Sequence, residues 1–239
     1  ILEDYPTAYI ELKEDGTYYH APYTGKWRVE GDGVILENYG WAGGGDVWFR
    51  IVDDTLLDES TGNRWVKTTP FSEDVEWLAK VIASEAGSVY DTEKGSWIKC
   101  TDTERVAVGW TVLNRLKMGF GGATTIKEVV TAPGQYAYGQ KPAPEIRELA
   151  ITLLQDRIPD PTGGATHFFS PISMPWQGDE GKFIERLGKH FDEFDTGGGL
   201  HEVPGISKKV YFPSWTKTYV WVGDLENVRR AYFMFYRQS

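Results

Sequence analysis

The sequence predicts an α+β protein, in which a small antiparallel β domain precedes a larger, mainly helical domain. Three observations lead to this fold class. Residues 1–70 alternate apolar and polar side chains in short runs separated by turn signals, as is typical of strands joined by hairpins. From residue 71 the apolar side chains take the i, i+3, i+4 spacing of amphipathic helices. After residue 160, short aromatic runs indicate a few C-terminal strands in a loop-rich segment.

We expect about five or six strands in residues 1–70. The strand-like runs begin near Ala8, Thr17, Gly25, Val34, Val47 and Arg64. Turn signals separate them at residues 14–16, 30–33 and 53–54, and two of these contain Asp-Gly pairs. Residues 43–46 predict a flexible loop, and residues 68–70 predict the linker to a second domain, 71–239.

The helical domain is expected to contain four helices. The first begins after Ser72 as N-cap and ends near Gly87. The second spans about 102–117 and is apolar almost all round, so we expect it to be the central buried helix. A short third helix starts near Thr125, and a fourth begins at Pro144, a favourable first-turn residue.

Composition excludes several classes of protein. The net charge of −10 disfavours non-specific binding to nucleic acid or to anionic membranes. The sequence contains no run of about 18 apolar residues, so no membrane span is expected. The opening ILEDYP has neither a basic start nor an apolar core, so we expect no signal peptide in this sequence.

Residues suited to metal or thiol chemistry are few. Cys100 is the single cysteine and cannot form an intrachain disulfide, and the four histidines are scattered along the chain. We therefore expect no structural zinc, no other metal and no cofactor. Cys100 as a peptidase nucleophile is disfavoured, because a lone cysteine is usually a small core residue. The acidic cluster at 192–195 lacks EF-hand spacing and is interpreted as a solvated loop.

Glu85 is the carboxylate that departs from the helical pattern. With Leu78 at 0° on a wheel of about 100° per residue, Ile82 falls near 40° and Glu85 near 340°. Glu85 thus extends the apolar stripe instead of facing the acidic outer side. A carboxyl group held against apolar neighbours has a raised pKa, which suits a general acid. The alternative is that Glu85, in the last turn, simply emerges into solvent.

Four blocks of the sequence resemble, in order, the SleB-type cell-wall hydrolases, the spore-cortex-lytic family. They are Val81-Ile-Ala-Ser-Glu-Ala-Gly87, the helix that ends in Val112-Leu-Asn-Arg115, Thr125 to Val130 followed by Pro133-Gly-Gln-Tyr136, and Asp160-Pro-Thr-Gly-Gly-Ala165 with Phe168-Phe-Ser-Pro171. The resemblance covers roughly residues 74–236. Two inserts depart from it, at 91–101 and at about 174–205, as do Gly87, His167 and Ser170.

This resemblance implies a lysozyme-like fold that acts on peptidoglycan glycan strands. It favours a lytic transglycosylase, which cleaves between N-acetylmuramic acid and N-acetylglucosamine with Glu85 as its single general acid and base. A hydrolytic muramidase remains the alternative, and it needs a second carboxylate. The nearest candidates in the chain are Asp91, Glu93, Asp102 and Glu104; solvation and helix capping explain them better.

The matching blocks also suggest residues that bind substrate. Gln135 could hydrogen-bond N-acetyl or hydroxyl groups, and Tyr136 could stack on a sugar face. Thr162, Gly163 and Gly164 would expose backbone amides where a sugar could approach closely. His167 is interpreted as a strand residue near the substrate and not as a base. For each of these positions, turn formation or packing is the alternative.

Two further functions stay open at this stage. The helical domain could bind glycan without cutting it, or the chain could be a structural component of a phage virion that carries a lytic domain. Residues 1–70 would then target, anchor or assemble the protein. Because cell-wall polymers are anionic, the acidic chain fits delivery by an assembly or action on a Gram-negative wall. Bacterial envelope, periplasm and phage virion all remain possible locations.

Overall fold

The computed structural model describes residues 10–12, 17–20, 23–39, 45–52, 55–58, 60–61, 64–66 and 73–238. The chain divides into two compact units, Ile1–Ser72 and Glu73–Ser239. The predicted linker 68–70, the predicted N-cap Ser72, and the expected turns at 14–16 and 53–54 lie outside the described residues, as do residues 43 and 44 of the expected loop. Each unit is considered by itself.

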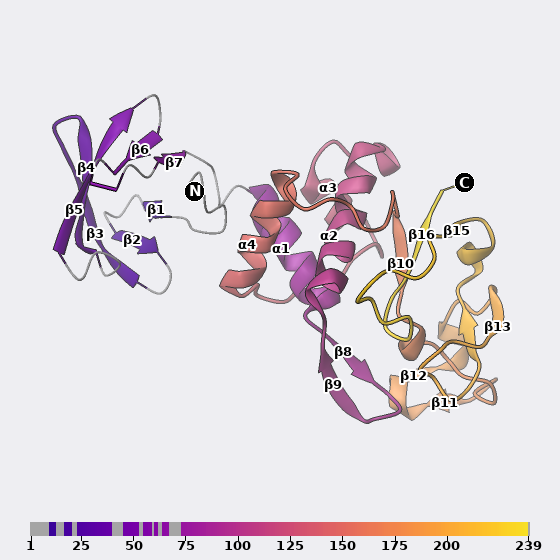
Figure 1. Cartoon of the computed structure of the whole chain (residues 1–239). Helices are drawn as coiled ribbons and strands as arrows, with labels where there is room; N and C mark the ends of the chain where they lie inside the picture. The colour runs from indigo at the N-terminus through magenta and orange to yellow at the C-terminus, as the bar shows by residue number, and fades with distance from the viewer. Residues whose placement is uncertain are drawn as a thin grey trace. The chain divides into compact units, whose positions relative to one another are not determined.

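The first unit is one antiparallel sheet in which each strand pairs with the next along the chain (Figure 1). Seven strands are described, more than expected: β1 (Glu11–Leu12), β2 (Thr17–His20), β3 (Tyr23–Glu30), β4 (Gly33–Tyr39), β5 (Gly45–Val52), β6 (Thr55–Leu57) and β7 (Arg64–Val66). The predicted turn between β3 and β4 is confirmed, with Glu30 opposite Gly33 and Gly31 at a φ of 63°. Gly45 and Asp46, expected in a loop, begin β5.

The inward face of this sheet forms a small core. Tyr18, Val34, Leu36, Tyr39 and Phe49 are all buried and pack together. Val34 and Leu36 lie on one face of β4, and Ile35 between them is buried as well. Because no helix accompanies these strands among the described residues of the unit, the sheet must supply its own core.

Four helices form the first part of the second unit: α1 (Glu73–Ala86), α2 (Asp102–Lys117), α3 (Ile126–Thr131) and α4 (Pro144–Leu154). The predicted starts of α2 and α4 are confirmed. A capping box formed by Thr101 and Glu104 begins α2, and Thr125 with Glu128 does the same for α3. None of the helices in the described part of the chain has the length and apolar character of a membrane-spanning segment.

The predicted central helix, α2, is buried along its middle from Glu104 to Arg115. Helices α1 and α4 both pack against it. Gly109 lies where they meet: a Cβ there would come within 2.6 Å of the Leu153 side chain and 3.2 Å of Ile82. The glycine therefore permits the close approach of the three helices that fixes the position of the end of α1.

Residues 88–99 form a β-hairpin, where the sequence indicated only an insert at 91–101. Its strands are β8 (Ser88–Asp91) and β9 (Ser96–Lys99), and the turn contains Gly95 at a φ of 64°. The hairpin connects α1 to α2 and extends beyond the ends of both helices (Figure 1). The strands are short and rich in polar and turn-forming residues, so the alternation that identifies a strand is weak here.

The C-terminal part of the unit is built from short strands and 3-10 helices, as its aromatic runs predicted. The strands are β10 (His167–Phe169), β11 (Phe183–Ile184), β12 (Lys189–His190), β13 (Gly199–His201), β14 (Val210–Phe212), β15 (Val220–Trp221) and β16 (Met234–Arg237), all paired antiparallel. The 3-10 helices of this part are Pro171–Ser173, Glu185–Leu187, Phe191–Glu193 and Ser214–Lys217, and another, Phe120–Gly122, lies between α2 and α3. Strands β10, β16 and β15 form a three-stranded sheet, in which β16 is the central strand.

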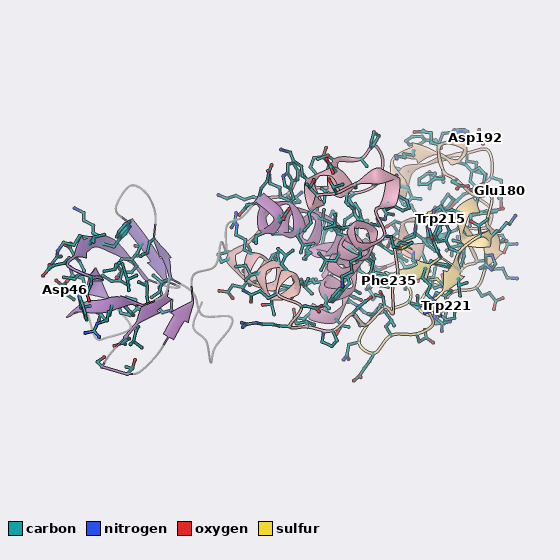
Figure 2. All side chains as sticks on the ribbon, turned by 90° about the horizontal axis from the view of Figure 1, so that it is seen from above. Asp46, Glu180, Asp192, Trp215, Trp221 and Phe235 are labelled. Carbon is teal, nitrogen blue, oxygen red and sulfur yellow. The ribbon has the colours of Figure 1, made fainter. Side chains whose placement is uncertain are left out.

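Aromatic side chains hold this segment together. Phe169, Trp215 and Tyr236 pack with ring centroids 5.2–6.1 Å apart. Trp215 and Phe235 lie between the helices and the outer loops, whereas Glu180 and Asp192 lie at the outer end (Figure 2). The whole is an α+β fold with antiparallel sheets, as predicted.

Candidate active site

Glu85 lies in the last turn of α1, on the side of the helix that faces the protein interior. Leu78 and Ile82 of the same stripe are fully buried, and Glu85 itself is half-buried. Its carboxylate oxygen Oε1 accepts a hydrogen bond of 2.5 Å from the backbone N–H of Ala137. The hydroxyl of the preceding residue, Ser84, accepts a hydrogen bond of 3.0 Å from the N–H of Gln140. The end of α1 therefore holds the loop that leads into α4.

Burial raises the pKa of Glu85, because removing water penalises the charged form. The Ala137 hydrogen bond and the positive charge of Arg115 act in the opposite direction, and burial outweighs them. The pKa therefore lies above the usual value of a glutamic acid. This is the direction that a general acid needs in order to carry a proton toward neutral pH.

The Glu85 side chain lines a pocket of about 380 Å³ at the junction of α1, the β8–β9 hairpin and β10. The residues that line it are Glu85, Ser88, Val89, Tyr90, Trp97, Arg115, Gln135, Phe168, Phe169, Ser170, Ser173 and Phe233. Glu85 is the one carboxylate in this lining. The remaining side chains are aromatic, hydroxyl or amide groups, together with Val89 and one cation, and such a lining suits a neutral polar ligand with apolar faces.

Arg115, at the end of α2, is the cation of the pocket and was not singled out from the sequence. It donates to the carbonyl of Thr166 at 2.5 Å and to Oε1 of Gln135 at 2.8 Å. Its guanidinium lies between the rings of Phe120 and Tyr136, at 4.8 and 4.7 Å from their centroids. Burial lowers the pKa of Arg115, but a guanidinium stays charged. The signal for this residue was an arginine in the last turn of α2, directly after its apolar stretch.

Of the residues predicted to bind substrate, Gln135 lines the pocket and Tyr136 does not. Tyr136 is 8% exposed, and its hydroxyl lies 3.1 Å from that of Thr111. Burial raises the pKa of Tyr136 to about 12. In this arrangement its ring supports Arg115 instead of offering a free face.

Thr162, Gly163 and Gly164 form a turn outside the pocket lining. Asp160 organises it: one carboxylate oxygen accepts from the Thr162 hydroxyl at 2.6 Å, and the other accepts from the N–H of Gly164 at 2.8 Å. That second oxygen also accepts from the Asn114 side chain. Gly163 and Gly164 have φ values of 58° and 96°, which explains the two glycines. Through the Asn114 hydrogen bond, the turn fastens the start of β10 to helix α2.

His167, in β10, also lies outside the pocket lining. Its ring packs against Tyr219, Trp215 and Phe120, with the Tyr219 centroid 4.1 Å away. Burial, helped by the charge of Arg115, lowers the pKa of His167 to about 4. The imidazole is therefore neutral near pH 7 and acts as a packing residue of the strand.

The four carboxylates considered as a second acid all have other partners. Asp91 accepts from the Tyr232 hydroxyl at 2.7 Å and Glu93 from the backbone N–H of Ser207 at 2.7 Å. Asp102 pairs with Arg105 at 3.1 Å, and Glu104 with Arg229 at 2.5 Å. Burial opposes ionisation of Asp91, yet the bonds from Tyr232 and Lys94 outweigh it and lower the pKa of Asp91 to about 2.

Neither thiol nor acidic-cluster chemistry finds support in the geometry. Cys100 is buried, and burial raises the pKa of its thiol to about 12, far from the thiolate that a nucleophile requires. In the acidic segment, the Asp195 carboxylate accepts bonds from the backbone and side chain of Ser214. No group of three His, Cys, Asp or Glu side chains within the described ranges is arranged to hold a metal ion.

Residues 101–191 match the family model of the cell wall hydrolases, and this match supports the SleB-type family that the sequence blocks resemble. The match begins at the N-cap of α2 and extends to β12; it is shorter than the predicted 74–236 and leaves Glu85 and the hairpin outside. The match supports an enzyme that acts on cell-wall peptidoglycan. No curated protein and no solved structure matches the chain, and the lysozyme-like fold stays a prediction.

Proposed function

We propose that residues 73–239 cleave peptidoglycan glycan strands between N-acetylmuramic acid and N-acetylglucosamine as a lytic transglycosylase. The observation that carries this proposal is Glu85, a half-buried carboxyl group with a raised pKa and the one carboxylate that lines the pocket. A two-carboxylate hydrolase needs a second acid facing the same bond, about 5–9.5 Å from the first. The four nearest candidates in the chain are held by other partners.

The reaction needs one group that gives a proton and then takes one back. Protonated Glu85 donates its proton to the glycosidic oxygen as the bond to C1 of the muramic acid breaks. The C6 hydroxyl of the same sugar attacks C1, and the Glu85 carboxylate accepts the hydroxyl proton. The ring closes to the 1,6-anhydro product, Glu85 is again protonated, and no water is consumed.

The surroundings of Glu85 suit both halves of this cycle. Burial favours the neutral acid before bond cleavage. The Ala137 N–H and the nearby charge of Arg115 favour the carboxylate once the proton has left. A residue that acts as acid and then as base needs both protonation states, and the surroundings of Glu85 contain an influence that favours each of them.

Mass spectrometry of muropeptides released from purified sacculi tests the proposal. We expect products that end in 1,6-anhydro-N-acetylmuramic acid, about 18 Da lighter than the hydrolysed ends because no water is added. Glu85→Gln, in which the acid is lost, is the matched control and should release neither product. Reducible ends alone would instead identify a muramidase, and Asp91, Glu93, Asp102 and Glu104 would then be mutated in search of its second acid.

A further inference from the structure

The β8–β9 hairpin displays two aromatic side chains that its own folding does not require. Tyr90 and Trp97 lie directly opposite each other on the two strands, with ring centroids 5.4 Å apart and planes at 63°. Tyr90 is 37% exposed and Trp97 is 69% exposed. On the other face of the hairpin Val89 is buried and supplies the packing. Exposing an indole to water is unfavourable, so this pair is suited to cover a ligand.

The aromatic pair is continuous with the candidate active site. Tyr90 and Trp97 line the same pocket as Glu85, together with the hydroxyl groups of Ser88, Ser170 and Ser173. The hairpin begins two residues after the end of α1, so a ligand that reaches Glu85 extends directly onto it. Aromatic faces next to hydroxyl donors and acceptors match a pyranose ring, which has apolar C–H faces and a polar edge.

Contacts with the C-terminal segment hold the hairpin in place. The buried Asp91 accepts from the Tyr232 hydroxyl at 2.7 Å and forms an ion pair of 3.0 Å with Lys94 across the turn. Thr92 donates to the carbonyl of Ile172 at 3.0 Å. Glu93 accepts from the backbone N–H of Ser207 at 2.7 Å. A platform fixed in this way loses little conformational freedom when a ligand binds.

We propose that Trp97 and Tyr90 form a sugar-binding subsite that holds one pyranose unit of the glycan strand next to the bond at which Glu85 acts. The inference rests on the proposed function and deepens it by assigning the occupant of the inserted hairpin. The occupant is the glycan and not a peptide stem, because Tyr90 and Trp97 are uncharged aromatic side chains. The one cation of the pocket, Arg115, already donates to Thr166 and Gln135.

Binding of soluble, stem-free glycan strands to the full chain tests this subsite. Glu85→Gln serves as the background, so that strands are not cut during titration. Adding Trp97→Ala should raise the dissociation constant about tenfold, the size expected for losing an aromatic stacking partner. Trp97→Phe, which keeps an aromatic face, should stay within about threefold of the background. Because Trp97 is mostly exposed, neither change should disturb folding.

Phe183→Ala is the matched control, since Phe183 is 65% exposed on the β11–β12 hairpin and does not line the pocket. It should leave the dissociation constant of the Glu85→Gln background unchanged. Equal binding by the Trp97→Ala protein, or an equal loss in the Phe183→Ala protein, would overturn the subsite. Strands that bind only when peptide stems are attached would also overturn it.

Cleavage by the chain with Glu85 intact, measured on the same strands, separates this inference from the proposed function. If the strands are not cut but binding depends on Trp97, the subsite stands and the proposed function fails. If they are cut but Trp97→Ala binds normally, the proposed function stands and the subsite fails. A chain that neither cuts nor binds the strands would contradict both.

Discussion

The role proposed for Glu85 depends on surroundings that act on its pKa in opposite directions. The helical wheel places its side chain on the buried side of α1, and the fold then places a pocket there. The resulting pKa reflects burial working against one hydrogen bond and one nearby cation. These are separable influences, and each can be changed by a single substitution.

Replacing Glu85 with glutamine should abolish lysis without unfolding the protein. Glutamine keeps the shape of the side chain but carries no transferable proton, and general acid–base action alone contributes about 10²–10⁴ in rate. A zymogram on peptidoglycan measures the loss, and circular dichroism confirms the fold. Activity within about threefold of wild type on folded protein would remove Glu85 from the mechanism.

Arg115→Gln should move the alkaline limb of the pH profile of kcat/KM to higher pH. The acid must be protonated to act, so activity falls as pH rises through the pKa of Glu85. Arg115 lowers that pKa, and removing its charge should raise it further. The position of the limb is the readout, because the height of the profile also reflects binding. A limb that stays in place or moves down would show that Arg115 does not act on Glu85.

At the scale of elements, Glu104 links the start of α2 to the C-terminal segment. It is fully buried and accepts from the N–H of Thr101 at 2.8 Å, and it pairs with Arg229 at 2.5 Å. Burial alone would raise the pKa of Glu104, but the bonds from Arg229 and Thr101 outweigh it and lower the pKa. The ionised form therefore stabilises the fold.

Glu104→Gln should lower the free energy of unfolding by about 3 kcal/mol at pH 7, because it breaks a buried ion pair. This value is the low end of the range for such pairs, since solvent reaches Arg229 and screens the interaction. Since the folded pKa is depressed, this contribution is full above the unfolded pKa and is lost as pH falls through the folded value. Urea unfolding of both proteins at several pH values measures it. A difference that does not shrink in acid would contradict the assignment.

The helices could be predicted from the sequence because their signals are local. The spacing of apolar residues in α1 and the Pro144 start of α4 depend on neighbours a few residues away. The β8–β9 hairpin was missed because its stability comes from distant partners, such as Tyr232 for Asp91. No local pattern records a contact of that kind.

The same distinction applies to the site. Glu85 could be singled out from periodicity, whereas the pocket lining joins α1, the hairpin, the end of α2 and β10. Whether Tyr136 or Thr162 faces the pocket depends on how these elements pack, and the sequence gives no such information. The roles assigned to Glu85 and to Gln135 remain predictions.

At the scale of the whole molecule, the chain divides between Ser72 and Glu73. The residues that match the cell wall hydrolases, the pocket and Glu85 all lie on the C-terminal side. The sheet of the first unit has a core of its own, built around Tyr18 and Phe49. A unit with a separate core can fold and function independently of its neighbour.

A fragment of residues 71–239 should therefore fold alone and cut peptidoglycan. Its helices and C-terminal strands form one compact unit, in which Gly109 allows α1, α2 and α4 to meet. We expect a cooperative thermal transition and a cleavage rate on isolated sacculi within about threefold of the full chain. The same fragment carrying Glu85→Gln is the control for contaminating activity. An insoluble fragment, or one that melts without a cooperative transition, would show that the second unit needs the β unit in order to fold. A folded fragment that cuts only solubilised strands would instead show that residues 1–70 attach the protein to the intact wall.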